Sequence, residues 1–463
     1  MPALSEHKLD IVRTLVETAP DTVVNSLQGA LASVGAETPL GSVRRLVESE
    51  ARDRQLRNTV LLPIVPMCSG ATRDPGDLAF PTRVLGLLWR GLKAEAPAVV
   101  RAAQLALFDH RPGVTSAEHF DQLAAIAAQG VRAREVREFR LAAEACDSAR
   151  PGGAEALAAC LDLAAVVRSV AHKLADWVAH PTEDAMIGSR LAYKDAVAIA
   201  PDAGPRFFRM LGAQLPHDWM VLRLISAIMD RPTERYLAES ELGVFAERML
   251  SEIGDALTTI QKFDLDLGPA AAVQAARLVD KITIEANEFE NLVSLSRDQG
   301  WGYTVTAHRK ALAAVVEGRL RECEKYFQQA LPSGAARLKR IRRTIPRLSN
   351  PPDMGRVSRC QTLLTFVSEI RHSANYGGFA AARARLLEKL GEQLDHYVEE
   401  VLDMVKTGES DDAENARAFL AITADFARLI RDDKAAELVC RRSVSAFAAA
   451  AALDPAPSLA AGT

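Results

Sequence analysis

The chain has 463 residues, of which 48% are hydrophobic and 25% are charged, a balance that excludes a mainly disordered protein. Its formal net charge is −4 and its pI is near 6.2, so any nucleic-acid site has to come from a local patch rather than from the overall charge. Aromatic residues make up only 5%, and alanine and leucine dominate the apolar set. This composition favours closely packed helices over strands.

The fold predicted from these data is all-α, a multi-helix bundle or array of antiparallel helical hairpins with long helices in the C-terminal half. A chain of this length exceeds one ordinary hydrophobic core. We predict an N-terminal domain of short helices at 1–150, a middle helical segment at 151–231, a long-helix bundle at 232–447 and a disordered tail at 448–463. Whether 1–231 forms one domain or two is left open.

Short helices separated by prolines and glycines are expected in the first 150 residues. Three helices are predicted within 8–60. The apolar segment LLPIVPMCSG that follows carries two prolines, and we interpret it as a buried, extended connector. Further helices are predicted at 97–108, 115–128 and 131–149.

Long amphipathic helices are predicted beyond residue 232. One is expected to run to about Lys262, and a second from Pro269 to about Arg297. Apolar residues alternate in steps of three and four, as in a coiled-coil-like seam. The seam positions are Ala272, Ala275, Val279, Ile282, Ala286, Phe289 and Val293, then Val305, Leu312, Val316, Leu320, Cys323 and Phe327, and later Leu387, Leu390, Leu394, Tyr397, Val401 and Met404. Asp411 is the expected N-cap of the following helix.

The stretch 331–359 concentrates positive charge between the long helices, and prolines limit any helix within it. We interpret it as a basic connector. Its charge has three explanations: contact with a protein or membrane surface, contact with nucleic-acid phosphates, or pairing with acidic faces of neighbouring helices. The residues that would carry an interaction are Arg337, Lys339, Arg340, Arg342, Arg343 and Arg347.

No phosphate-binding loop, dinucleotide fingerprint, nucleophile elbow or H-E-x-x-H motif occurs in the sequence. His172, Asp176 and His180 are spaced by four, as on one helical face, and His217-Asp218 follows downstream. An HD dipeptide in a helical protein resembles the metal-dependent HD phosphohydrolases, which bind a metal through such a pair plus a separate His and Asp. The resemblance ends at the dipeptide, because Trp219 follows where that family usually has a small residue.

Other polar sets are interpreted as solvated helix faces. These sets are Glu285, Glu288 and Glu290, and Glu392, His396 and Glu400. Trp301 and Tyr303 lie beside glycines and indicate either a contact surface or a packed helix corner.

The sequence therefore favours a non-catalytic helical adaptor or regulatory protein that acts through protein–protein interaction. The alternatives are a metal-dependent HD phosphohydrolase using His172, His180, His217 and Asp218, and a nucleic-acid-binding regulator using 337–347. We assign no catalytic residue, metal or cofactor; a protein partner is expected, self-association is left open, and nucleic acid or a membrane surface is less favoured. The start MPALSEHKLD lacks the apolar core of a signal peptide, and the six cysteines form no C-x-x-C pair, which predicts a cytoplasmic protein.

Overall fold

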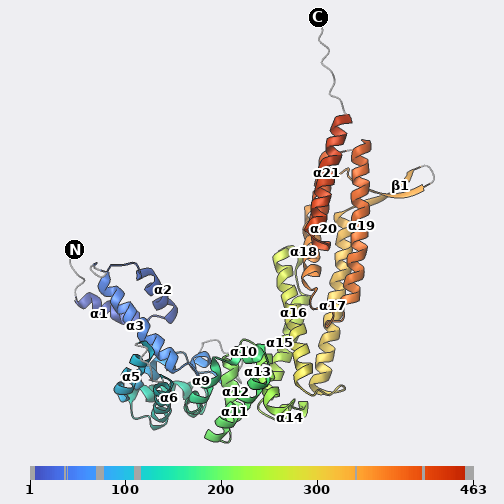
Figure 1. Cartoon of the computed structure of the whole chain (residues 1–463). Coiled ribbons are helices and arrows are strands. Elements are labelled where there is room, and N and C mark those ends of the chain that lie inside the picture. Colours follow the sequence, from blue (N-terminus) through green and yellow to red (C-terminus); the bar gives the residue numbers. More distant parts are fainter. Residues whose placement is uncertain are drawn as a thin grey trace. The chain divides into compact units, whose positions relative to one another are not determined.

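The computed structural model describes residues 6–35, 38, 40–68, 78–108, 116–338, 341–408 and 412–453, and these are almost wholly helical (Figure 1). The predicted all-α class is confirmed. The chain divides into two compact units: Met1–Pro232 with Leu237–Phe245 form the N-terminal unit, and Thr233–Tyr236 with Ala246–Thr463 form the C-terminal unit. Within the described ranges, no helix combines the length and the apolar character needed to cross a membrane.

The N-terminal unit is built from short helices. They are α1 (Glu6–Thr18), α2 (Asp21–Leu31), α3 (Gly41–Val60), α4 (Arg83–Glu95), α5 (Pro97–Phe108), α6 (Ser116–Ala133), α7 (Arg137–Ala149), α8 (Gly153–Asp162), α9 (Ala164–Ala171), α10 (Leu174–Ala179), α11 (Glu183–Ile199), α12 (Ala203–Ala213) and α13 (Asp218–Met229). The three helices predicted within 8–60 are α1 to α3. Val16, Val24 and Val47 are buried where these three helices meet.

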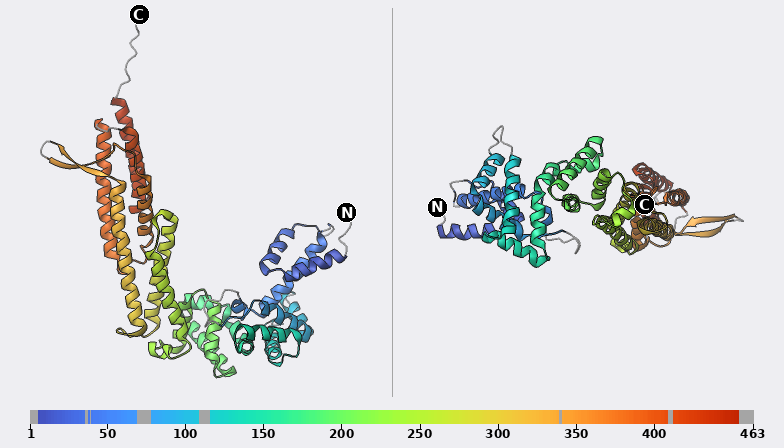
Figure 2. Two further views of the ribbon diagram at one scale, coloured as in Figure 1. Left: turned by 180° about the vertical axis from the view of Figure 1, so that it is seen from behind. Right: turned by 90° about the horizontal axis from the view of Figure 1, so that it is seen from below.

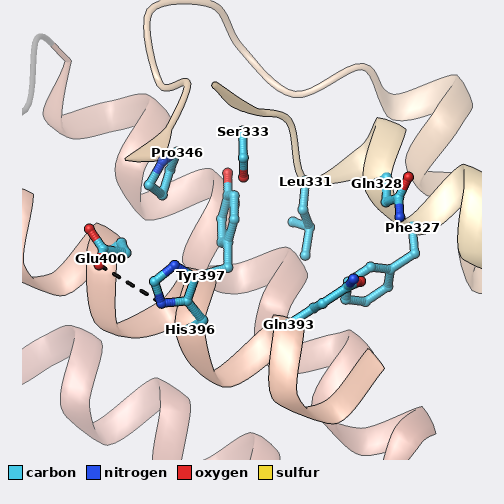
Figure 3. A pocket seen from close by; sticks show the side chains of 9 residues that line it. All are labelled: Phe327, Gln328, Leu331, Ser333, Pro346, Gln393, His396, Tyr397 and Glu400. Carbon is cyan, nitrogen blue, oxygen red and sulfur yellow. Dashed lines mark ion pairs between the residues drawn. The ribbon is translucent and has the colours of Figure 1, made fainter. Parts of the chain in front are cut away.

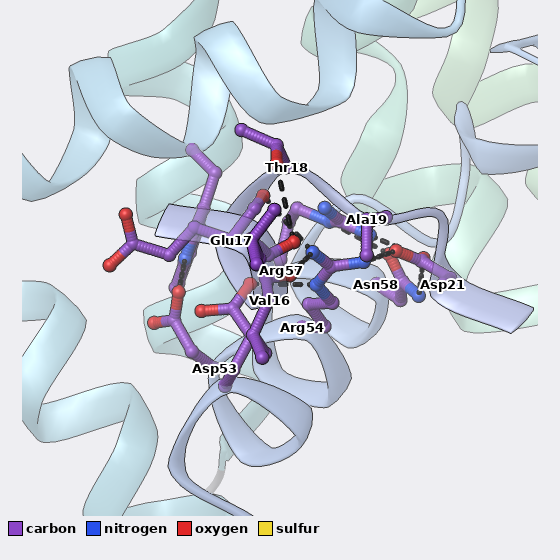
Figure 4. Close-up of polar contacts among 12 residues, drawn as sticks. Val16, Glu17, Thr18, Ala19, Asp21, Asp53, Arg54, Arg57 and Asn58 are labelled. Atoms are coloured by element: carbon purple, nitrogen blue, oxygen red, sulfur yellow. Dashed lines mark hydrogen bonds and ion pairs between the residues drawn. The ribbon is translucent and has the colours of Figure 1, made fainter. Parts of the chain in front are cut away.

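One buried arginine joins α1, α2 and α3 (Figure 4). Arg54 on α3 is only 8% exposed and donates hydrogen bonds to the carbonyl oxygens of Val16, Glu17 and Ala19, at 2.9, 3.1 and 2.8 Å. These carbonyls belong to the end of α1, where no intrahelical donor remains for them. The same guanidinium lies 2.7 Å from the carboxylate of Asp21, the first residue of α2. Arg54 thereby caps one helix and contacts the start of the next.

Arginines cap the ends of other helices in the same way. Arg168 donates to the carbonyls of Thr59 and Val60 at the end of α3, at 2.7 and 2.6 Å. Arg383 donates at 2.7 Å to the carbonyl of Val367 near the end of α18 (Met354–Glu369). The carbonyl end of a helix carries a partial negative charge, so a cation there stabilises it.

The apolar segment after α3 is buried but not extended. Ile64 and Met67 are in the core, as expected for a buried connector. The backbone, however, forms turns and a 3₁₀ helix, η1 (Val65–Cys68), with the Ile64 amide donating to Leu61 and the Met67 amide donating to Ile64. The prediction of an extended segment was wrong, because the two prolines preset φ angles that suit tight turns as well as strands.

The C-terminal unit contains the long helices. After α14 (Glu234–Ala238), α15 (Gly243–Gln261) and the 3₁₀ helix η2 (Leu265–Leu267) come α16 (Pro269–Leu292), α17 (Gly300–Ala330), β1 (Ser333–Leu338), β2 (Ile341–Pro346), α18, α19 (Ala380–Thr407), α20 (Ala413–Ile430) and α21 (Asp433–Leu453). The predicted seams of α16 and α17 are buried throughout. In α19 the seam is buried from Leu390 to Val401, while Leu387 and Met404 at its ends are half-buried.

Several local predictions for the chain beyond residue 232 were wrong. The helix expected from 232 to about 262 is interrupted between α14 and α15, where the Ser240 hydroxyl accepts a hydrogen bond from the Leu242 amide. Asp412 caps α20, accepting from the amides of Glu414 and Asn415, whereas the predicted cap Asp411 lies outside the described residues. The alanine-rich segment after 447 continues α21 through Leu453.

Two acidic residues predicted to be solvated are buried. Glu285 on α16 lies 3.7 Å from the ammonium group of Lys281, and Glu400 on α19 lies 3.8 Å from His396. Residue type alone favours an exposed glutamate, but an ion pair one turn away allows burial.

Candidate functional site

The basic stretch forms an antiparallel β-hairpin. In register, Ser333 pairs with Pro346, and Leu338 pairs with Ile341 across the turn. Figures 1 and 2 show this hairpin projecting from the helices of the C-terminal unit beside α19. The sequence predicts a basic connector here and not a hairpin, because its prolines and arginines disfavour a helix without indicating paired strands.

Hydrogen bonding in the hairpin leaves the outer edge of β1 open. The amide of Arg347 donates to the carbonyl of Pro332 at 2.9 Å, which makes this pair a hydrogen-bonded one. Hydrogen-bonded and non-hydrogen-bonded pairs alternate along an antiparallel ladder, so the next pair, Ser333 with Pro346, is non-hydrogen-bonded. The backbone groups that point outward from β1 are therefore those of Ser333, Ala335 and Arg337.

The outer edge of β2 offers fewer backbone hydrogen-bond donors to an added strand. Its outward positions are Arg342, Thr344 and Pro346, and proline has no amide hydrogen to donate. The strand β2 also contacts α19. In the described part of the chain the sheet has two strands only, so no third strand covers the β1 edge.

The predicted interaction residues fall in different places. Arg337, Arg342 and Arg343 lie in the two strands, and the register sets Arg337 directly opposite Arg342. Arg347 follows β2 and is exposed. Lys339 and Arg340 lie outside the described residues.

Trp301 and Tyr303 are not part of this site. They begin α17, whose 31 residues span about 45 Å, and the hairpin follows the other end of that helix. The Trp301 ring packs 5.8 Å from that of Phe289, and its amide is capped by the Glu234 carboxylate. Trp301 is therefore part of a packed helix corner, while Tyr303 is 61% exposed.

A pocket of about 320 Å³ lies at the root of the hairpin (Figure 3). Ser333 begins β1 and Pro346 ends β2, so both strands contribute to its rim. The remaining lining residues come from the end of α17, from the residue that follows it and from one face of α19. They are Phe327, Gln328, Leu331, Gln393, His396, Tyr397 and Glu400.

Two buried polar atoms in this root pocket have no hydrogen-bond partner among the described residues. They are the hydroxyl of Tyr397, a residue only 5% exposed, and the Oε1 atom of Gln393 one turn earlier on α19. Burial raises the pKa of the Tyr397 phenol, so it keeps its proton at neutral pH and can donate. A buried polar atom left unpaired is unfavourable, which makes both atoms candidates for contacting a ligand.

The described lining of the root pocket carries little charge. Among these lining residues none is a lysine or an arginine, and the Glu400 carboxylate lies 3.8 Å from the His396 imidazole. Apolar surface comes from Phe327, Leu331 and Pro346. An uncharged group with hydrogen-bonding capacity and some apolar surface fits this lining best.

The histidines of the metal hypothesis do not share one helix. His172 lies between α9 and α10, and His180 follows α10, where it pairs at 3.2 Å with an exposed Asp176. His217 precedes α13 and stacks on Trp219 with ring centroids 6.4 Å apart. The prediction of a single helical face was wrong. Within the described ranges, no group of three or more His, Cys, Asp or Glu side chains is arranged to hold a metal ion.

The N-terminal unit contains one hollow with a basic lining. Arg52, Lys93 and Arg101 surround about 610 Å³ together with apolar residues of α5. Lys93 already pairs with Asp53 at 2.9 Å. Among the described residues, no buried, unpartnered polar atom lines this hollow, so the root pocket is the stronger candidate.

Comparison with known proteins adds no relative: no protein-family model, curated protein or solved structure matches the chain. The sequence did contain one signal for the root pocket. Gln393, His396, Tyr397 and Glu400 recur at helical spacing, which sets polar groups on the side of α19 next to its apolar seam.

Proposed function

We propose that this protein is a non-catalytic adaptor or regulatory protein that binds an extended segment of a protein partner along the outer edge of β1. The observation that carries the proposal is the open edge at Ser333, Ala335 and Arg337 on a hairpin with only two strands in the described chain. Unpaired strand edges template the addition of another strand, and peptide-recognition proteins use this mode. The sequence predicts an interaction through helical surfaces, whereas in this proposal the partner binds a strand edge that the helices support.

The partner segment is acidic in this proposal. Arg337 and Arg342 oppose one another in the ladder, and Arg343 is adjacent in β2. Carboxylates on an added strand would offset this like-charge pairing. The contrast between this local charge and the chain's net charge of −4 supports a local docking site over general polyanion binding.

Two other functions have less support. A two-stranded ribbon can enter the major groove of DNA, so nucleic acid stays an outcome of the test below. The HD phosphohydrolase needs a metal, and the described residues offer no cluster to hold one. A cytoplasmic setting is part of our proposal and is supported by six free cysteines, five of them buried.

The test is selection from a random peptide library on the full-length protein, followed by affinity measurements on the selected peptides. We expect peptides rich in Asp and Glu, with affinity that falls as salt is raised. Replacing Arg337, Arg342 and Arg343 together by glutamine should weaken binding about tenfold, since ion pairs at protein surfaces typically contribute about 0.2–1 kcal/mol each.

Replacement of Arg356, Arg371 and Arg385 by glutamine is the matched control. These arginines lie in the same unit, are exposed, and lie outside the hairpin, so peptide affinity should not change. The proposal is wrong if no acidic peptide is selected, or if labelled duplex DNA or single-stranded RNA binds more tightly than any peptide and loses that binding in the hairpin variant.

A further inference from the structure

We propose that the root pocket is a specificity pocket for one uncharged amide or hydroxyl side chain (Asn, Gln, Ser or Thr) of the segment that adds to β1. This inference rests on the proposed function. It assigns a ligand class to a cavity lined by two buried polar atoms that have no partner among the described residues.

The position of the root pocket links it to the strand edge. Ser333 is both the first outward-facing residue of β1 and a residue of the pocket rim. Cross-strand neighbours place their side chains on the same face of a sheet. The residue of an added strand that pairs with Ser333 would therefore lie beside Ser333 at the pocket rim, on the side away from Pro346 (Figure 3).

The unpartnered atoms define the chemistry of that side chain. The Tyr397 hydroxyl is a donor that can also accept, and Gln393 Oε1 accepts only. A carboxamide supplies both an acceptor and donors, and a hydroxyl supplies one of each. A carboxylate has no hydrogen to donate to Gln393 Oε1, so acidic side chains belong along the arginines and not in the pocket.

Size and apolar surface agree with this assignment. A cavity of about 320 Å³ is large enough for one side chain and is at the small end for a separate organic ligand. Phe327 and Leu331 would contact the aliphatic part of the side chain. A site that hydrogen-bonds its ligand in this way strongly rejects analogues that lack the polar group.

The experiment is a substitution scan of a library-selected acidic peptide, read by affinity on the wild-type protein and on Tyr397→Phe and Gln393→Leu. At one peptide position Asn, Gln, Ser or Thr should bind more tightly than Ala, Leu or Asp. Tyr397→Phe should lower the affinity for that peptide about three- to tenfold, because one uncharged hydrogen bond is lost. It should also abolish the preference for an amide or hydroxyl at that position. Tyr303→Phe removes an exposed hydroxyl from the same unit. It should change neither the peptide affinity nor the preference at that peptide position.

A second readout separates a binding role from a structural one. If the Tyr397 hydroxyl is unpaired in the free protein, Tyr397→Phe should leave the melting temperature unchanged or raise it, because a buried unpaired hydroxyl is unfavourable. A clear fall in melting temperature would show that the hydroxyl is already satisfied, for example by ordered water, and would overturn the inference.

Failure of the inference can be distinguished from failure of the proposed function. If acidic peptides bind and the arginine variant weakens them, but no position prefers an amide or hydroxyl, the specificity pocket is wrong while strand addition stands. If no peptide binds, both are wrong.

Discussion

The side-chain amide of Asn415 on α20 donates a 2.9 Å hydrogen bond to the backbone carbonyl of Leu348, two residues after β2 ends. Both residues are buried. This contact attaches the returning end of the hairpin to the helical support. The direction in which the hairpin leaves the unit depends on such contacts, since a two-stranded hairpin alone is marginally stable.

Asn415→Ala should therefore destabilise the C-terminal unit by about 1–3 kcal/mol, because the buried Leu348 carbonyl loses its donor. Urea unfolding followed by circular dichroism measures the change. Gln274→Ala removes an exposed amide from α16 and is the control, with an expected change near zero. Equal effects of the two substitutions would show that the contact does not anchor the hairpin.

Replacing two glycines of α17 by alanine should change the stability of the protein in opposite directions. A Cβ at Gly302 would clash with the carbonyl oxygen of Ser296, so Gly302→Ala should destabilise the protein. At Gly318 nothing lies within 4 Å of the added atom, and Gly318→Ala should stabilise the helix by roughly 0.5–1 kcal/mol. Melting temperatures of the two variants compared with wild type test the pair. A lower melting temperature for Gly318→Ala would contradict the helical packing described here.

Arg319→Lys tests the arginine capping of helix ends. The Arg319 guanidinium donates at 2.9 Å to the carbonyls of Gln261, the last residue of α15, and of Phe263, and it lies 5.5 Å from the Phe263 ring. Lysine keeps the charge but cannot bond two carbonyls with a planar fork, so we expect a loss of about 1–2 kcal/mol. Arg321→Lys, at an exposed position of the same helix, should be nearly neutral. If Arg319→Lys were also nearly neutral for stability, the positive charge alone would account for the stabilisation by Arg319.

Stability should depend on the protonation of Asp21. Burial opposes ionisation of this carboxylate, but Arg57, Asn58 and Arg54 together lower its pKa below 3.8. A lowered folded-state pKa gives stabilisation that is present above the unfolded-state pKa and lost as pH falls through the folded-state value. Asp21→Asn should therefore cost stability at pH 7, and this cost should shrink below about pH 4.

The expected cost is modest, at most about 1 kcal/mol, because the Asp21 side chain is 42% exposed and solvent screens the pair. Asp10→Asn, which breaks a fully surface pair with Arg13, is the matched control. Denaturant unfolding from pH 7 to about pH 3.5 measures both variants. A cost that grows on acidification would contradict the assigned direction of the pKa shift.

The helical part of the fold could be predicted because burial follows a 3.6-residue period. Val279, Phe289 and Val316 were placed in seams by spacing alone, and all are buried. Contacts that join distant residues could not be predicted in this way. Arg54 caps a helix that ends more than 30 residues earlier, and nothing near Arg54 in the sequence indicates which carbonyls it meets.

The hairpin and the root pocket were missed for related reasons. The two residues between Leu338 and Ile341 in the sequence are Lys339-Arg340 and not the Asn-Gly or Asp-Gly that signals a hairpin. Tyr397 was correctly assigned to a buried seam, but a seam position predicts burial and not whether the hydroxyl finds a partner.

The most direct test of strand addition compares two proline substitutions on opposite edges of the hairpin. Ala335→Pro removes an outward amide from β1, and Thr344→Pro removes one from β2; neither amide takes part in pairing between the strands. The affinity of a selected acidic peptide is measured for both variants, with sedimentation of the protein alone as a check for self-association. Our account predicts that Ala335→Pro abolishes peptide binding and that Thr344→Pro preserves it. Equal binding by both variants, or a wild-type dimer that Ala335→Pro dissociates, would contradict it.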